Sequence, residues 1–275
     1  MKCYAKALRA NWLLYALTVS SLFVQACTSR QTGAADGVPS AKSDFMYQYS
    51  IIDALLGGVF DGNLTLGQLK TKGDFGIGTF NRVDGELIVD QGKVYKVRYD
   101  GSIQEVPDHD STSIAFVKFF KADSSFTLRD STITLDQLEQ QLMATLPANE
   151  LYAIRMKGRF SKLTARAPGA ARKPYPSLKD HLAKHQYLFN LSNTSGVVIG
   201  FLLPGYLAKV NVPGFHFHYL ADDHKSGGHI FDFTTNELTV EIDKIQGYTV
   251  ELNTVADFDK VGLDKDRQEE LRKIE

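Results

Sequence analysis

The stretch Gly214-Phe215-His216-Phe217-His218-Tyr219, followed by Gly227-Gly228-His229, is the most informative part of the sequence for both fold and function. Side chains of an extended strand alternate between its two faces, so His216 and His218 share one face. The Gly-Gly step then places His229 at the start of the next extended run. We therefore expect a β-hairpin that brings three imidazoles together.

This grouping of histidines is typical of a catalytic metal site. Four of the 7 histidines lie between residues 216 and 229. Neutral imidazoles suit Zn2+, and cobalt, nickel, manganese or iron also bind such ligand sets. Three protein ligands leave a coordination position open for substrate. His224 lies in a polar turn beside Asp222 and Asp223, and we interpret it as a loop residue rather than a ligand.

The N-terminus predicts export. Basic residues within positions 2–9 precede an apolar stretch, residues 12–24, that is short for a bilayer. The sequence Val24-Gln25-Ala26-Cys27 then resembles a lipoprotein signal. It predicts a signal peptide at residues 1–26 and lipidation of Cys27 as the first mature residue. Simple secretory cleavage and a retained helical anchor are the alternatives.

Cysteine usage agrees with this prediction. Of the 2 cysteines, Cys3 would leave with the signal and Cys27 would carry the lipid. No thiol would remain for a disulfide, for catalysis or for a metal. Residues 28–44 are rich in small and polar side chains, which is typical of a flexible tether. The expected location is the bacterial cell envelope, with membrane contact only through the N-terminal lipid anchor.

Residues 45–275 are long enough for one large domain, which we divide into halves at 45–148 and 149–275. A net charge of -1 and an isoelectric point near 6.7 argue against a nucleic-acid partner, which requires a basic surface. The glycine-rich run 73–79 lacks the spacing and the following helix of a nucleotide-binding loop. We interpret this run as a tight backbone path that positions Thr79 and Asn81.

Strands dominate the rest of the pattern. Runs at 86–89, 93–99 and 102–106 are separated by Gln91-Gly92 and Asp100-Gly101, which predicts an antiparallel meander. Further strands are expected at 114–120, 151–165, 187–191, 196–203, 229–234 and 238–252, the last with a break near Gly247.

Helices are fewer and are marked by their N-terminal caps. Thr65 and Thr134 each precede a glutamine by three residues, as in a capping box, and the first helix is expected to end at Gly73. Ser177 begins a third helix, and a charged helix is expected at 264–275. The predicted fold class is α+β: two β-sheet-based halves with antiparallel or mixed sheets, a few peripheral helices and a single compact unit.

Several short motifs occur in order between residue 45 and the C-terminus. Besides the histidine hairpin they are Tyr49-Ser50, Phe60-Asp61-Gly62, Gly73-Asp74-Phe75-Gly76-Ile77-Gly78-Thr79-Phe80-Asn81, Asp84-Gly85-Glu86, Pro174-Tyr175-Pro176 and Asn211-Val212-Pro213. Together they resemble the α-acetolactate decarboxylase family. The resemblance implies a zinc-dependent carboxy-lyase that converts (S)-2-acetolactate to (R)-acetoin and carbon dioxide through a metal-stabilised enediolate, as in acetoin and butanediol biosynthesis.

The resemblance also implies the metal ligands and part of the substrate pocket. The family's zinc-binding imidazoles correspond to His216, His218 and His229. Its pocket glutamate corresponds to Glu86 and its pocket threonine to Thr79. On local sequence alone, Glu86 would be interpreted as an exposed residue at the edge of a strand, since glutamate is rarely buried without a partner.

Arg166 corresponds to the family's active-site arginine. A guanidinium can orient a substrate carboxylate through two parallel hydrogen bonds. Without the resemblance, Arg166 would be interpreted as a solvated residue, with Arg159 and Arg172 as nearby competitors.

The family also has a glutamate near its C-terminal end that folds back toward the metal. Counting from the hairpin without gaps selects Glu275, and Glu269 and Glu270 in the same tail are the alternatives. The enediolate must be protonated on one face, and a buried carboxylic acid can supply that proton. We favour Glu86 as the acid and Glu275 as a metal-side or second acidic group.

Two other functions remain open at this level. One is decarboxylation of a related 2-hydroxy-3-keto acid such as acetohydroxybutyrate, which differs from acetolactate by one methylene. The other is a catalytically inactive metal- or ligand-binding lipoprotein with the same fold. Edge strands and the family resemblance both favour a homodimer.

Overall fold

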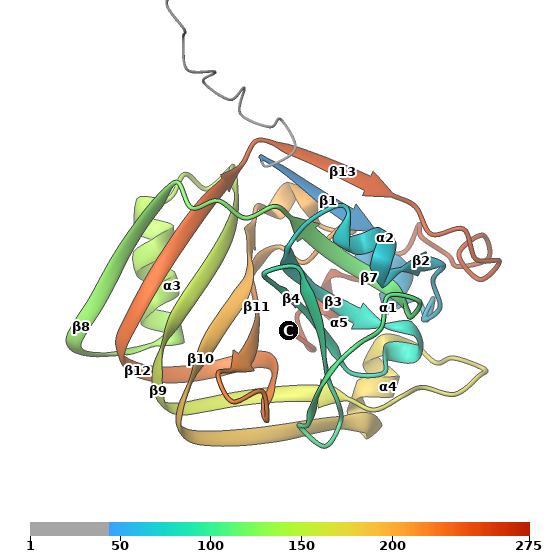
Figure 1. Ribbon diagram of the computed structural model, residues 1–275. Coiled ribbons are helices and arrows are strands. Elements are labelled where there is room, and N and C mark those ends of the chain that lie inside the picture. The colour runs from blue at the N-terminus through green and yellow to red at the C-terminus, as the bar shows by residue number, and fades with distance from the viewer. Residues whose placement is uncertain (1–43) are drawn as a thin grey trace, which may run out of the picture. The chain divides into compact units, whose positions relative to one another are not determined.

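Two β-sheets form the framework of residues 44–275, the part of the chain that the computed structural model describes (Figure 1). The predicted signal peptide, Cys27 and residues 28–43 of the tether lie outside this part. The predicted α+β class with two sheets and peripheral helices is confirmed. No helix among the described residues is long and apolar enough to cross a membrane.

The first sheet has eight strands in the order β13-β1-β7-β3-β4-β5-β6, with β2 pairing beside β7. Neighbours are antiparallel except for β1 and β13, which run parallel. Strands β4, β5 and β6 form the predicted meander. The bounds are β1 (Phe45–Tyr49), β2 (Leu64–Thr65), β3 (Phe75–Phe80), β4 (Glu86–Asp90), β5 (Lys93–Val97), β6 (Ile103–Glu105), β7 (Ser111–Lys118) and β13 (Gly247–Glu251).

The second sheet has five strands in the order β11-β10-β9-β12-β8. Strand β11 also pairs with β12, so β9, β10, β11 and β12 close into a ring of paired strands. Long strands permit this closure because their two ends can pair with different neighbours. The bounds are β8 (Ser124–Thr134), β9 (Leu151–Pro168), β10 (Gln186–Leu203), β11 (Gly214–Ala221) and β12 (Gly227–Ile245).

The helices begin where the sequence predicts caps. Thr65 and Thr134 form complete capping boxes, and the hydroxyl of Ser177 accepts a hydrogen bond from the backbone N–H of Asp180. The first capped helix ends at Lys70 rather than at Gly73. The helices are α1 (Ile52–Leu56), α2 (Leu66–Lys70), α3 (Leu135–Thr145), α4 (Leu178–His185) and α5 (Gln268–Leu271), with 3-10 turns η1 (Asn81–Val83) and η2 (Gly205–Leu207).

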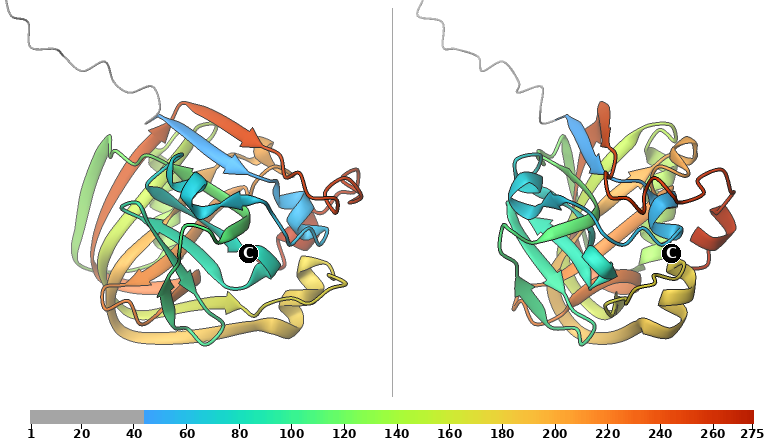
Figure 2. Two further views of the ribbon diagram at one scale, coloured as in Figure 1. Left: turned by 45° about the vertical axis from the view of Figure 1, so that its right-hand side comes forward. Right: turned by 90° about the vertical axis from the view of Figure 1, so that its right-hand side faces the viewer.

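Three apolar clusters pack these layers together. The largest joins both sheets and includes Ile77 of β3 and Phe201 of β10. A second lies between the second sheet and α3, through Leu138, and a third packs α2 against the first sheet through Leu66. Figure 1 shows α3 on the second sheet, on the side away from the first. The space between the sheets is thus filled mainly by side chains. The C-terminal end of the chain lies at this space, and both views of Figure 2 show it close to the yellow helix α4.

The chain does not divide near residue 148. It passes from the first sheet to the second between β7 and β8, and β13 returns to the first sheet to pair with β1. The halves 45–148 and 149–275 therefore do not correspond to the two sheets. Strand β8 was missed because most of its side chains are exposed, so it lacks a clear apolar alternation.

Most of the glycine-rich run 73–79, predicted as a tight backbone path, belongs to strand β3, which begins at Phe75. A Cβ atom at Gly76 would lie 2.1 Å from the carbonyl oxygen of Phe116, and one at Gly78 would lie 2.4 Å from that of Ile114. These glycines therefore allow β3 to approach β7 closely, which a sequence pattern cannot show.

Two further predictions need correction. Residues 187–191 and 196–203 belong to one strand, β10, because Asn193 adopts a left-handed conformation (φ 52°) inside the pairing with β9 instead of forming a turn. The charged helix expected at 264–275 is limited to the four residues of α5. Tertiary contacts of Leu271 and Ile274 with the core shape the remainder of this segment.

Candidate active site

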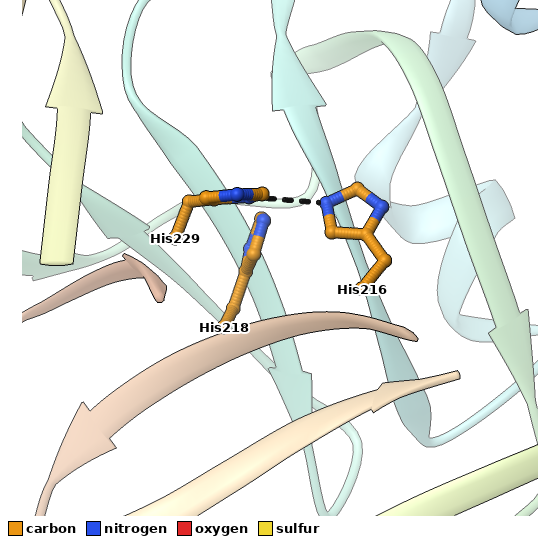
Figure 3. Close-up of side chains that lie close together, drawn as sticks. All are labelled: His216, His218 and His229. Atoms are coloured by element: carbon orange, nitrogen blue, oxygen red, sulfur yellow. Dashed lines mark hydrogen bonds between the residues drawn. The ribbon is translucent and has the colours of Figure 1, made fainter. Parts of the chain in front are cut away.

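The hairpin of β11 and β12 assembles the predicted histidines. His218 lies directly opposite His229, and His216 lies two residues earlier on the same face of β11. One ring nitrogen from each histidine lies within 4.8 Å of the other two. Figure 3 shows the three rings turned toward a common space. His224 lies in the exposed turn, where its ring packs 4.9 Å from that of Tyr95, as expected for a loop residue.

Strand β9 brings Arg166 to the same place. Arg166 pairs with His229 across β9 and β12, so His218, His229 and Arg166 form one row over three strands. This row requires glycine at position 228. Gly228 has φ 139°, and a Cβ atom there would lie 2.3 Å from the carbonyl oxygen of Arg166. The close approach of two backbones therefore sets the separation of the imidazoles and the guanidinium.

The imidazoles are held neutral. Burial is the main cause that lowers the pKa of each ring, and the positive charge of Arg166 adds to it. The pKa of His216 falls to about 3. The pKa values of His218 and His229 lie well below the usual range. All three rings therefore keep a free lone pair at neutral pH.

Hydrogen bonding orients the rings. The Nδ1–H group of His218 donates to the carbonyl oxygen of Leu87 in β4, at 3.0 Å. Because a carbonyl can only accept, this contact leaves the Nε2 lone pair of His218 facing the site. His229 Nδ1 and His216 Nε2 lie 3.2 Å apart (Figure 3). Two nitrogens this close, together with a third directed nearby, suit a shared divalent cation.

The donor set fits a divalent metal ion. It consists of buried, neutral nitrogen ligands within coordination reach of one point, with carboxylate oxygens at the periphery. In many metal sites, a ligating histidine donates its other ring N–H to a carbonyl or carboxylate oxygen, which fixes the ring orientation. The Leu87 carbonyl oxygen accepts this hydrogen bond from His218. His216, His218 and His229 can therefore hold such an ion.

Glu86 lies at the start of β4, where the first sheet meets the hairpin. Its Oε2 atom is 3.6 Å from Nε2 of His218, and the residue is buried. Burial raises the pKa of Glu86 to about 8, although Arg166 opposes the shift, and Glu275 adds to it. The interpretation of Glu86 as an exposed edge residue is therefore wrong. A carboxyl group of this kind carries a proton near neutral pH.

Glu275 reaches the site from the C-terminal segment. Its Oε2 atom lies 3.6 Å from Nε2 of His229 and 3.9 Å from Nε2 of His216. The residue as a whole is exposed, but its side chain is only 21% exposed. Burial raises the pKa of this carboxyl group, and Arg166 opposes the rise. The other tail glutamates point elsewhere, since Glu269 pairs with Lys273 and Glu270 with Arg267.

Arg166 is buried and only partly bound by the protein. Its Nη1 donates to Oε1 of Gln186 at 2.7 Å, and its guanidinium lies 5.0 Å from the ring centre of Phe231. Its Nε–H is buried without a partner among the described residues. This donor is available to an anionic ligand. Arg159 and Arg172 do not line the cavity around the histidines.

Thr79 lies directly opposite Glu86 in the pairing of β3 with β4, so both side chains project on one face. The Thr79 hydroxyl donates to the carbonyl oxygen of Gly85 at 2.7 Å. This bond ties β3 to the turn that precedes Glu86. Thr79 therefore supports the position of the carboxyl group, and it also lines the cavity.

All seven predicted pocket residues line one cavity between the sheets. Its remaining walls are mostly apolar, and they come from α1, α4, η1, β3, β7 and the end of β9. They are Ile52, Leu55, Gly78, Val83, Ile114, Phe116, Pro168, Leu178 and Leu182. Sequence reasoning missed these residues, along with Gln186, Phe231 and the Leu87 carbonyl. A larger surface pocket lies on the other side of α4, near Tyr187, and contains none of the predicted site residues.

The arrangement of these side chains defines a class of protein. Three neutral imidazoles that can share a metal ion, two protonatable carboxyl groups and one guanidinium surround a small, largely apolar cavity. That combination is the site of an enzyme acting on a small anionic molecule.

Comparison with known proteins identifies the family. The sequence profile of α-acetolactate decarboxylase matches residues 46–265. The chain is 39% identical over 234 residues to the α-acetolactate decarboxylase of Methanosarcina mazei, covering 85% of this chain and 81% of that one. It is 37% identical over 220 residues to the enzyme of Bacillus subtilis, covering 80% and 86%. The chain therefore belongs to the α-acetolactate decarboxylase family, a family of carboxy-lyases.

A solved structure agrees with this assignment. The crystal structure of α-acetolactate decarboxylase from Bacillus subtilis strain 168 superposes with a TM-score of 0.80 at 35% identity, covering 82% of this chain and 97% of that one. The resemblance seen in the sequence motifs is thus confirmed. The family profile ends before Glu275, so the position of that residue rests on the geometry of this structure.

Proposed function

We propose that this chain converts (S)-2-acetolactate to (R)-acetoin and carbon dioxide with a divalent metal, zinc in particular, held by His216, His218 and His229. The observation that carries the proposal is the convergence of these imidazoles with Glu86 and Arg166 in one cavity. Family membership supports the substrate and the reaction. A metal bound here supplies Lewis-acid stabilisation of the negative charge that develops on the substrate oxygens.

Arg166 binds the substrate carboxylate. Its buried, unpartnered Nε–H provides a charge-assisted hydrogen bond, and Gln186 and Phe231 hold the guanidinium in place. The carboxylate must lose its charge as carbon dioxide leaves, so contacts that bind it too tightly would stabilise the ground state. An arginine that offers only part of its donors meets this requirement.

The C–C bond to the carboxylate breaks, and its electron pair passes into the adjacent carbonyl to give an enediolate and neutral carbon dioxide. The carbon that lost the carboxylate then takes a proton. Glu86 is buried with a pKa raised to about 8, so it carries that proton at neutral pH. Glu275 stands on the other side of the imidazoles as a second acidic group. Thr79 supports Glu86 through the Gly85 carbonyl.

Acetoin formation from racemic acetolactate tests the proposal. The purified protein is assayed as prepared, after metal removal by a chelator, and after return of Zn2+. The rate of acetoin formation should fall about tenfold or more when the metal is removed and should recover when it is returned. The reason is that a group stabilising the developing negative charge lowers the reaction barrier by about a few kcal/mol. Folded, zinc-loaded protein that releases no acetoin would refute it. The rate with acetohydroxybutyrate, measured in parallel, shows how strongly the apolar walls of the cavity select against one additional methylene group in the substrate.

We also propose that the chain is exported and anchored by a lipid on Cys27. The support is the sequence pattern of residues 1–27. Mass measurement of the protein from a membrane fraction tests it, because a lipidated Cys27 and a simply cleaved terminus have different masses.

We propose that the protein forms a homodimer. Residues 186–194 of β10 pair only with β9 among the described strands, and Tyr187 and Leu188 on this edge are 42% and 57% exposed. The whole of β10 contains no charged residue, although charges usually protect an edge strand from pairing. Leu188→Lys should therefore change the mass measured by light scattering from that of a dimer to that of a monomer. A wild-type protein with the mass of a monomer would refute the proposal.

A further inference from the structure

Four buried polar atoms without hydrogen-bond partners among the described residues belong to α1 and to the start of α5. They are both carboxylate oxygens of Asp53, Nε of Arg267 and Nε2 of Gln268. Asp53 is only 1% exposed. Two are acceptors and two are donors, so the set is complementary. Buried groups of this kind are normally paired, and an unpaired set at one junction indicates a contact that the fold is built to make.

Several contacts show that the two elements lie together. Lys209 and Arg267 are close enough to lower the pKa of Asp53, which burial raises. A Cβ atom at Gly57 would lie 2.4 Å from a methyl group of Val261, so the end of α1 also touches the segment that leads to α5.

The same junction adjoins the active site. Ile52 and Leu55, on either side of Asp53 in α1, line the cavity. Arg267 directly precedes the short helix α5. Leu271, the last residue of α5, and Ile274 beyond it are both buried in the core. That segment ends with the Glu275 carboxyl group beside His229. The position of Glu275 therefore depends on how α5 sits against α1.

We propose that Asp53 is a positioning residue that latches the C-terminal segment, by accepting a hydrogen bond from the Arg267 Nε–H group, and so fixes Glu275 beside the histidines. The inference rests on the role proposed above for Glu275. Arg267 has the right donors free, because only its Nη1 is engaged, by Glu270 at 3.2 Å. Asp53 makes no contact with the cavity itself, so its effect on the reaction passes through Glu275.

The test combines kinetics with hydrogen exchange on the full protein. Asp53→Asn, Glu275→Gln and the double variant are compared for kcat, and backbone exchange of residues 268–275 is followed by mass spectrometry. We expect Asp53→Asn to lower kcat about tenfold and to speed exchange of the segment about tenfold or more, as for loss of one charge-assisted bond. In the Glu275→Gln background, Asp53→Asn should lower kcat no further.

Asp257→Asn is the matched control, since Asp257 is an exposed aspartate of the same C-terminal region. It should change neither kcat nor exchange. If Asp53→Asn fails to fold, the same measurements are made on Arg267→Lys. Lysine keeps the positive charge of Arg267 but has no N–H donor at the position of Nε.

Losses that multiply in the double variant, with unchanged exchange of residues 268–275, would overturn the latch. Full activity of Glu275→Gln would instead remove the proposed role of Glu275. The exchange measurement would still decide whether Asp53 holds the segment, so the two failures are distinguishable.

Discussion

Gly228→Ala should destabilise the protein and displace His229. The added Cβ would lie 2.3 Å from the Arg166 carbonyl oxygen and 3.0 Å and 3.2 Å from the Arg166 carbonyl carbon and nitrogen. These are backbone atoms of a central strand, so they cannot turn aside as a flexible side chain would. Alanine at φ 139° adds conformational strain of about 1–2 kcal/mol, and the overpacking adds about 1–3 kcal/mol. We expect a loss of about 2–5 kcal/mol in the free energy of unfolding.

Two other glycines separate these contributions. Gly214 has φ 89° but nothing within 4 Å of an added Cβ, so Gly214→Ala should show only the strain, about 1–2 kcal/mol. Gly205 also has open space and no left-handed conformation, so Gly205→Ala should change stability by less than about 0.5 kcal/mol. Urea midpoints of the three variants give the comparison.

Zinc affinity, measured by competition with a chromophoric chelator, reports the position of His229. It should fall about 10- to 100-fold in Gly228→Ala, as when the support of a metal ligand is disturbed, and remain unchanged in Gly205→Ala. A Gly228→Ala protein as stable as Gly214→Ala, with normal zinc affinity, would refute the argument that close backbone approach sets the geometry of the site.

Three further changes test other parts of the structure. Arg166→Lys keeps the charge but loses the planar donors, so kcat/KM for acetolactate should fall about 10- to 100-fold in initial-rate assays, and an unchanged value would exclude the carboxylate contact. Burial, with Asp136, raises the pKa of Glu139 from 4.5 to about 7, so its contribution to stability is full below pH 4.5 and is lost as the pH rises through 7. Glu139→Gln should therefore raise stability at pH 8 by about 1–2 kcal/mol and leave it unchanged at pH 4, as read from urea midpoints. Lys118 and Asp243 form a buried ion pair between the two sheets. Lys118→Met alone should cost about 3–5 kcal/mol and Lys118→Met/Asp243→Leu distinctly less, because only the single variant leaves an unpaired buried charge; equal losses would contradict this.

Much of the local structure was predictable because its causes lie within a few residues. The capping boxes at Thr65 and Thr134 and the meander turns depend on neighbouring side chains and backbone conformations, and they are present as expected. Predictions were wrong, or an element was missed, where a distant strand changes the outcome. Asn193 stays within β10 because β9 supplies its neighbours' hydrogen bonds, and β3 forms because its glycines admit β7.

Sequence by itself determined the histidine hairpin, since strand alternation puts His216 and His218 on one face and a short turn returns His229. The motifs also pointed to the family, and through it to the other pocket residues. Only the tertiary structure decided that Arg166 lies in register with His229 and that Glu275 folds back to the same point. Such contacts join residues far apart in the chain, so they depend on the packing free energy of the whole core rather than on any local preference.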